Sequence, residues 1–243
     1  MLGSDVSHPL ISQFGDALRR AGYGEARLRQ AVGTSSSLRH DPRGSEVARQ
    51  RLASGNALHT LIKAFCLGLP VPRNELTHAV GAATVDNLVR LALVTWEQDT
   101  LTPLIAIDAA QDLLIAHDPA RKDEPLMGDH VIGLGPAPRT LAALTVRLKA
   151  GRVLDLGAGS GIHALLALNH CDQAVATDIN PRALAYTRFN AASIVSLHRR
   201  PARVTCSSHW RARRLTSSWP IPLTSCRQIR ASITAIAGWP ATS

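Results

Sequence analysis

The 243-residue chain lacks several features that would assign it to a specialised class. No run of about 18 apolar residues occurs, and no basic start leads into an apolar segment with a cleavage site, so neither a membrane span nor a secretion signal is expected. The four cysteines share no close pairing or metal-type spacing, which argues against a disulfide framework and against a metal site. With 45% hydrophobic residues, the composition predicts a globular, cytoplasmic protein with one large or two small domains.

Acidic residues are absent from the last part of the chain. All 18 Asp and Glu lie in residues 1–178, whereas residues 179–243 contain Arg but neither Lys nor any acid. The net charge of +9 therefore originates in this last part, which is also rich in Ser, Pro and Trp and has little periodicity. We interpret residues 193–243 as an atypical tail.

The first part of the chain predicts helices followed by strands. Helices are expected in residues 9–24, 25–33, 56–69, 72–81 (with Pro72 near the start) and 84–94 (capped by Thr84), a loop in 34–45, and strands in 93–98, 102–108 and 112–118. Three helices followed by a hairpin resemble a winged helix, which assigns residues 1–125 to a helical, winged-helix-like cap domain. In DNA-binding members of that class the third helix enters the major groove, but here it offers mainly Arg90 and Asn87 beside the acidic Asp86. A packing or substrate-positioning cap is therefore favoured over DNA recognition.

The segment Val153–Gly161, "VLDLGAGSG", predicts a different architecture in residues 126–192. After a polar linker (121–130), the pattern predicts a helix in 136–149, a strand buried on both faces in 152–156, a helix in 162–170, a strand in 174–179 and a helix in 181–192 capped by Asn180. This β-α-β-α order is typical of a parallel α/β sheet that binds its ligand at the carboxyl ends of the strands.

The spacing of the glycines indicates which ligand is expected there. A dinucleotide fingerprint needs glycine at position 162, where the chain has Ile162, and Asp155 would repel a pyrophosphate. An acid at this place suits a ligand that carries an ammonium group. Asp178 ends the second strand and can accept hydrogen bonds from both hydroxyls of a ribose. Ammonium and ribose together describe S-adenosylmethionine.

"VLDLGAGSGIHALLAL" and "VATDINPRALAYTRFNA" resemble the first two motifs of class I S-adenosylmethionine-dependent methyltransferases. The resemblance is strongest to the branch that methylates planar nitrogens, which includes release-factor glutamine methyltransferases and ribosomal-RNA base methyltransferases. It implies a Rossmann-like domain and a protein or RNA substrate. It also implies a set of cofactor-binding residues: Asp155, Gly157, Ala158, Gly159, Gly161, Asp178, Ile179 and Asn180. A plain helix cap is an equally good interpretation of Asn180, and His163 and His170 are expected to be ordinary helix residues.

The catalytic Asn-Pro-Pro-Tyr loop of that branch is absent, so no catalytic residue is assigned. If the coding sequence is read one nucleotide back, allowed codons for Arg214–Thr224 give Phe-Asp-Leu-Val-Val-Ala-Asn-Pro-Pro-Tyr. Those for residues 204–214 permit the acid-bearing Tyr-Met-Phe-Glu-Pro-Leu-Ala-Gly. This continuity favours a frameshift near residues 193–204, which leaves an incomplete and inactive methyltransferase domain. The alternative is a non-enzymatic nucleic-acid-binding protein, in which an Arg- and Trp-rich tail follows a winged-helix-like domain.

Overall fold

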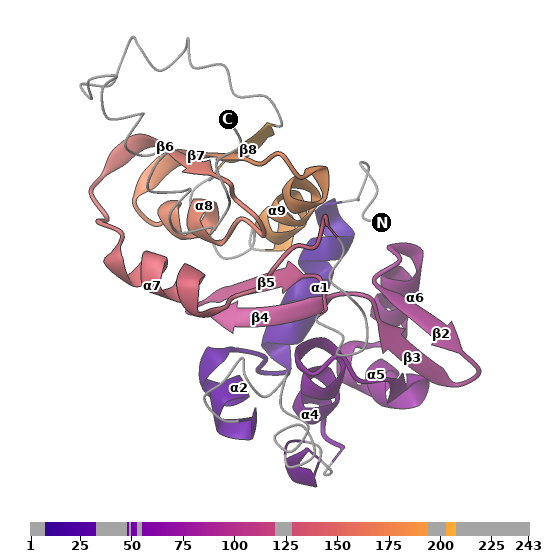
Figure 1. Cartoon of the computed structure of the whole chain (residues 1–243). Coiled ribbons are helices and arrows are strands. Elements are labelled where there is room, and N and C mark those ends of the chain that lie inside the picture. Colours follow the sequence, from indigo (N-terminus) through magenta and orange to yellow (C-terminus); the bar gives the residue numbers. More distant parts are fainter. Residues whose placement is uncertain are drawn as a thin grey trace. The chain divides into compact units, whose positions relative to one another are not determined.

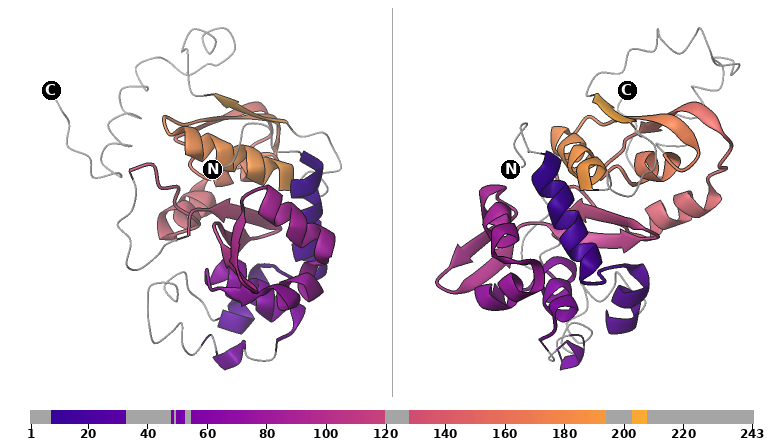
Figure 2. Two further views of the ribbon diagram at one scale, coloured as in Figure 1. Left: turned by 90° about the vertical axis from the view of Figure 1, so that its right-hand side faces the viewer. Right: turned by 180° about the vertical axis from the view of Figure 1, so that it is seen from behind.

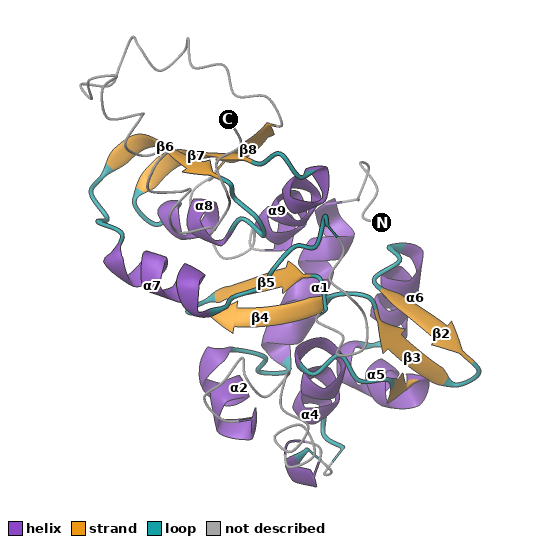
Figure 3. Cartoon of the chain, viewed as in Figure 1, coloured by secondary structure: helices purple, strands orange, loops and turns teal. Residues whose placement is uncertain are grey.

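The chain forms a mixed α/β structure (Figures 1 and 3). The computed structural model describes residues 8–32, 48, 50–52, 55–119, 128–193 and 203–207. These residues all lie in the first of the two units into which the chain divides, Met1–His209. We call the described residues up to 119 the cap region and those from 128 onwards the α/β region. The loop expected at 34–45 and most of the linker at 121–130 lie outside the described residues, as does the tail at 193–243 except for residues 193 and 203–207.

The cap region begins with helices whose bounds follow local signals in the sequence. They are α1 (His8–Arg20), α2 (Glu25–Val32), α4 (Ala57–Leu61) with the π-helix η2 (Ile62–Cys66), α5 (Arg73–Val80) and α6 (Ala82–Arg90). Asn56 caps α4, because its side chain accepts a hydrogen bond from the His59 N–H at 2.8 Å. Gly81 separates α5 from α6 with a φ of 88°, which glycine adopts without strain. The expected Thr84 cap is wrong, because α6 already begins at Ala82.

Two small antiparallel sheets complete the cap region, and the first strand of one of them lies between η2 and α5. The first has the order β1 (Val71–Pro72), β3 (Thr100–Pro103), β2 (Val94–Glu97), and the second pairs β4 (Ala106–Ala110) with β5 (Leu113–His117). The single strand expected at 102–108 is wrong, because it is divided between β3 and β4. At the division, the Leu104 N–H donates to the carbonyl of Leu93 at 2.9 Å, and the chain leaves the first sheet.

The α/β region contains a parallel three-stranded sheet. Its elements are α7 (Pro136–Leu144), β6 (Ala150–Leu156), α8 (Ile162–Ala167), β7 (Cys171–Thr177), α9 (Pro181–Ser193) and β8 (Arg203–Ser207). The strand order is β6-β7-β8, and both pairings are parallel, as predicted for β6 and β7. Helices α8 and α9 lie along one face of this sheet (Figures 1 and 2). Within the described part of the chain, no helix has the length and apolar character needed to cross a membrane.

Two further expectations for the α/β region are wrong. The helix that begins at Pro136 ends at Leu144 rather than Lys149, where Thr145 becomes extended and its hydroxyl donates to the carbonyl of Leu141 at 2.6 Å. Strand β6 is not buried on both faces, because its residues are exposed or half-buried and Leu156 is 52% exposed. Among the described strands, β6 pairs only with β7, so it lies at the edge of the sheet.

The buried apolar side chains form two clusters, and helix α9 contributes to the larger one. The first cluster fills the cap region around Phe65, whose ring packs edge-on against Phe14 at 5.2 Å. It also includes Tyr186 and Phe189 of α9. The second cluster lies between α8 and the sheet, and it also includes Ala110, Leu113 and Ile115 of the β4–β5 hairpin. Because α9 follows β7 directly, packing of α9 into the cap core connects the two regions.

Candidate functional site

The glycine loop after β6 meets the end of β7, as the sequence predicts. The N–H groups of Gly157 and Ala158 donate to the carbonyl of Thr177 at 2.8 and 2.9 Å, and the Gly159 N–H donates to Asp178 Oδ2 at 2.8 Å. Both strands end here because parallel strands have their carboxyl ends at the same edge of a sheet. The predicted proximity of the loop and Asp178 is confirmed.

The three glycines of the loop have different surroundings. All have positive φ angles, at 73° for Gly157, 54° for Gly159 and 83° for Gly161, so each avoids the strain that a side chain would bring. A Cβ added at Gly157 or Gly159 would meet nothing within 4 Å, so the backbone there faces open space. At Gly161 an added Cβ would approach Thr187 Cγ2 to 2.7 Å, so this glycine allows α9 to pack closely.

Asp178 and Asn180 shape the segment between β7 and α9. Asp178 Oδ1 accepts a hydrogen bond from the Asn180 N–H at 2.9 Å, so each oxygen of this carboxylate is held by one backbone N–H. Asn180 Oδ1 accepts from the Arg182 N–H at 2.9 Å, and its side-chain amide donates to the carbonyl of Asp129 at 2.7 Å. Asn180 is therefore a helix cap that also holds the linker segment. Between these residues, Ile179 is 87% exposed, whereas Ala158 in the loop is buried.

Asp155 lies near the end of β6, and its carboxylate reaches the first turn of helix α8. Its Oδ2 accepts a hydrogen bond from the Ala164 N–H at 2.9 Å. Burial raises the pKa of Asp155, with a smaller contribution from the charge of Asp178, although His163 and the Ala164 N–H act in the opposite direction. The two acids therefore flank the loop, and a cation beside Asp155 would relieve the cost of its buried charge.

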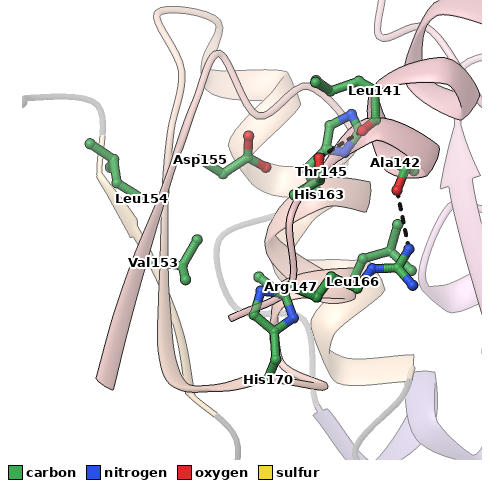
Figure 4. Close-up of a pocket in the computed structure, with 11 residues that line it drawn as sticks. Leu141, Ala142, Thr145, Arg147, Val153, Leu154, Asp155, His163, Leu166 and His170 are labelled. Atoms are coloured by element: carbon green, nitrogen blue, oxygen red, sulfur yellow. Dashed lines mark hydrogen bonds between the residues drawn. The ribbon is translucent and has the colours of Figure 1, made fainter. Parts of the chain in front are cut away.

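A groove lies between α7, β6 and α8 (Figure 4). Asp155, His163 and His170 line it together with apolar side chains that include Leu141, Val153 and Leu166. Its volume is about 190 Å³, which is below the ~300–1,000 Å³ usual for small-molecule sites. The groove is therefore too small to be the main ligand site, and the open space above Gly157 and Gly159 is the better candidate.

A second group of polar residues, which the sequence analysis missed, borders the candidate site. Asp118, just after β5, accepts hydrogen bonds from Arg182 and Tyr186 of α9, and Arg182 also forms an ion pair with Asp129. Burial opposes ionisation of Asp118, but the hydrogen bonds from Arg182, Val131 and Tyr186 outweigh it and lower the pKa of this carboxyl. One signal in the sequence could have pointed to Asp118, because this acid directly follows a predicted strand. Nothing in the sequence identified its hydrogen-bond partners.

A protein-family model matches part of the cap region. Residues 20–104 match a family model described as "Domain of unknown function (DUF7059)". No curated protein matches the chain. The match spans helices α2 to α6 and the first antiparallel sheet, and it ends before the glycine loop begins.

Proposed function

We propose that this chain derives from a class I S-adenosylmethionine-dependent methyltransferase that methylates a nitrogen of a protein or RNA substrate. In this proposal the α/β region is the first half of a Rossmann-like domain, and the cap region is a winged-helix-like domain that positions the substrate. The observation that carries the proposal is the hydrogen bond between Gly159 and Asp178, which unites the glycine loop with an acid at the ends of adjacent parallel strands.

The residues of the site fit the proposed cofactor. The bare backbone at Gly157 and Gly159 permits close approach of a ligand, which a side chain at either position would block. Asp155 would face the ammonium end of the cofactor, and Asp178 would accept hydrogen bonds from the ribose, because each carboxylate oxygen has a second lone pair besides the one used by the backbone. The cofactor would supply an activated methyl group. The contribution of these residues is to bind it and fix its orientation.

The frameshift hypothesis is supported by the surface around β6. This strand has a free edge among the described residues, and the nearby Leu144, Val146 and Leu148 are each 74–75% exposed. A further parallel strand beside β6 would pair the edge and cover apolar surface of this kind. In the alternative frame, allowed codons for Arg214–Thr224 permit an apolar segment suited to such a strand, followed by the missing Asn-Pro-Pro-Tyr loop.

Isothermal titration with S-adenosylmethionine tests the proposal on two proteins, the 243-residue chain and a chain with the reading frame restored. We expect the frame-restored chain to bind the cofactor and the 243-residue chain to bind at least about 100-fold more weakly, a difference of about 2.7 kcal/mol. Replacement of Asp178 by Ala in the frame-restored chain should abolish binding. Full affinity in the 243-residue chain would contradict the frameshift hypothesis, and no binding by either protein would contradict the methyltransferase assignment.

A further inference from the structure

The buried carboxylate of Asp118 is the centre of a polar cluster that belongs to both regions of the molecule. The side chain is 9% exposed and accepts three hydrogen bonds, from the Tyr186 hydroxyl at 2.7 Å, the Val131 N–H at 2.8 Å and Arg182 Nη2. These donors come from α9 and from the segment that precedes α7. A buried carboxylate with this many donors is costly to rearrange, because every lost partner leaves an unpaired polar group.

Polar contacts lead from this cluster toward the glycine loop, first through an ion pair and then through hydrogen bonds. Arg182 Nε lies 3.1 Å from Asp129 Oδ2, and the Asp129 carbonyl accepts a hydrogen bond from the Asn180 side chain at 2.7 Å. The Asn180 N–H then binds Asp178 Oδ1, while Asp178 Oδ2 holds the Gly159 N–H. The orientation of Asp178 thus depends on Asn180, and that of Asn180 depends on Asp129 and Arg182.

The segment that carries Asp129 is itself fixed to the β4–β5 hairpin of the cap region. The Leu134 N–H donates to Asp108 Oδ2 at 2.7 Å, and the Asp118 N–H donates to the Val131 carbonyl at 3.1 Å. The ring of His117 lies against Gly133 so closely that a Cβ there would come within 2.4 Å of Nε2. The cap region therefore fixes the position and orientation of the segment that carries Asp129.

We propose that Asp118 is a positioning residue that couples the cap region to the candidate cofactor site, through Arg182, Asp129 and Asn180 to Asp178 and the Gly159 loop. Asp118 acts by holding Arg182 where that side chain can form its ion pair with Asp129. The positional coupling of Asp118 to the Gly159 loop is a property of this chain alone, whereas its effect on cofactor affinity rests on the proposed function.

Hydrogen exchange followed by mass spectrometry tests, in the 243-residue chain, whether Asp118 holds the glycine loop in position. In Asp118→Asn, we expect the amides in segments 157–162 and 178–184 to exchange at least about tenfold faster, which corresponds to about 1.4 kcal/mol. Arg182→Lys should have a similar effect, because a lysine keeps the charge but cannot bridge both acids. Leu76→Ala, in the cap core, should accelerate exchange without preference for these two segments.

Glu25→Gln is the matched control. Glu25 also accepts hydrogen bonds from a backbone N–H, that of Gln111, and from arginines, and it joins the cap region to Arg139 of α7, but its contacts do not lead to the glycine loop. Its replacement should leave exchange in segments 157–162 and 178–184 unchanged. Folded Asp118→Asn and Arg182→Lys variants with unchanged exchange in those segments would overturn the proposal, as would the same acceleration in Glu25→Gln.

A titration of the frame-restored chain separates this inference from the proposed function. Asp118→Asn should weaken binding of S-adenosylmethionine by about tenfold, and Glu25→Gln by less than about twofold. If Asp118→Asn accelerates exchange but the unmodified frame-restored chain binds no cofactor, the proposed function fails and the positioning role stands. If that chain binds and Asp118→Asn binds equally well, the positioning role fails and the proposed function stands.

Discussion

The cap region and the α/β region differ in how completely they bury their apolar side chains. In the cap region Leu61, Leu76 and Leu88 are fully buried, and helix α9 of the α/β region completes the same cluster. In the α/β region helix α7 buries no residue, and Leu144 is 74% exposed. Helix α9 therefore packs as part of the cap core, whereas the surface around α7 and β6 exposes apolar side chains.

The largest expected difference between the two regions is in how much a Leu→Ala replacement lowers the free energy of unfolding. Leu76→Ala should lower the free energy of unfolding by about 2–5 kcal/mol, because it leaves a cavity in a filled core. Leu144→Ala should change it by less than about 0.5 kcal/mol, because this side chain is exposed in the 243-residue chain. Urea denaturation of both variants measures these changes in the free energy of unfolding. Equal changes would contradict the difference in burial between the two regions. In the frame-restored chain, the cost at Leu144 should rise.

An intermediate effect is expected at the junction of the two regions. Asp118→Asn should lower the free energy of unfolding by about 1–3 kcal/mol near neutral pH, because it removes the charge that pairs with Arg182. The pKa of Asp118 is lowered by folding, so its stabilising contribution is complete above the unfolded value of 3.8 and is lost as the pH falls through the lower folded value. The difference between the two proteins should therefore shrink below pH 3.8. If the difference in unfolding free energy between the two proteins stayed constant with pH, the loss of stability would come from packing and not from the charge of Asp118.

A smaller effect of opposite sign is expected at Asp155. Its pKa is raised by burial, so the ionised form weakens the fold once the pH exceeds the unfolded value of 3.8. Asp155→Asn keeps an acceptor for the Ala164 N–H and should raise the Tm at pH 7 by about 2–4 °C, the change that ~1 kcal/mol produces in a chain of this length. The gain should disappear below pH 3.8, and differential scanning calorimetry at both pH values measures it. In the frame-restored chain the same variant should bind cofactor at least about tenfold more weakly.

The smallest effect is expected from helix α6 on nucleic-acid binding. Because the cap core includes α9, the full chain is the proper sample. Arg90→Ala should leave duplex DNA affinity and its salt dependence unchanged, since exposed Asp86 accompanies Arg90 on this helix. If the tail in its given frame binds single-stranded nucleic acid, Ala at Arg211, Arg213 and Arg214 should weaken that binding and its salt dependence. Fluorescence anisotropy at several salt concentrations measures nucleic-acid binding by the Arg90 variant and by the tail variant. A large loss of DNA binding in Arg90→Ala would support DNA recognition by the cap region.

The sequence determined the features of this protein that depend on neighbouring residues. Glycine spacing, caps and apolar periodicity located α1, α2, α5, β6, β7 and α9 to within a few residues, because these signals act over one or two turns of the backbone. The pairing of Gly159 with Asp178 was predictable for a related reason, since adjacent parallel strands bring their ends together.

Only the tertiary structure decided features that depend on residues distant in sequence. The exposure of β6 was not predictable from its apolar residues, because burial depends on whether another element covers the strand. The packing of α9 into the cap core joins α9 to α1, and the path from Asp118 through Arg182 and Asp129 to Asn180 joins residues up to 64 positions apart. No local pattern encodes such contacts, because a buried carboxylate takes whichever donors the fold brings within reach.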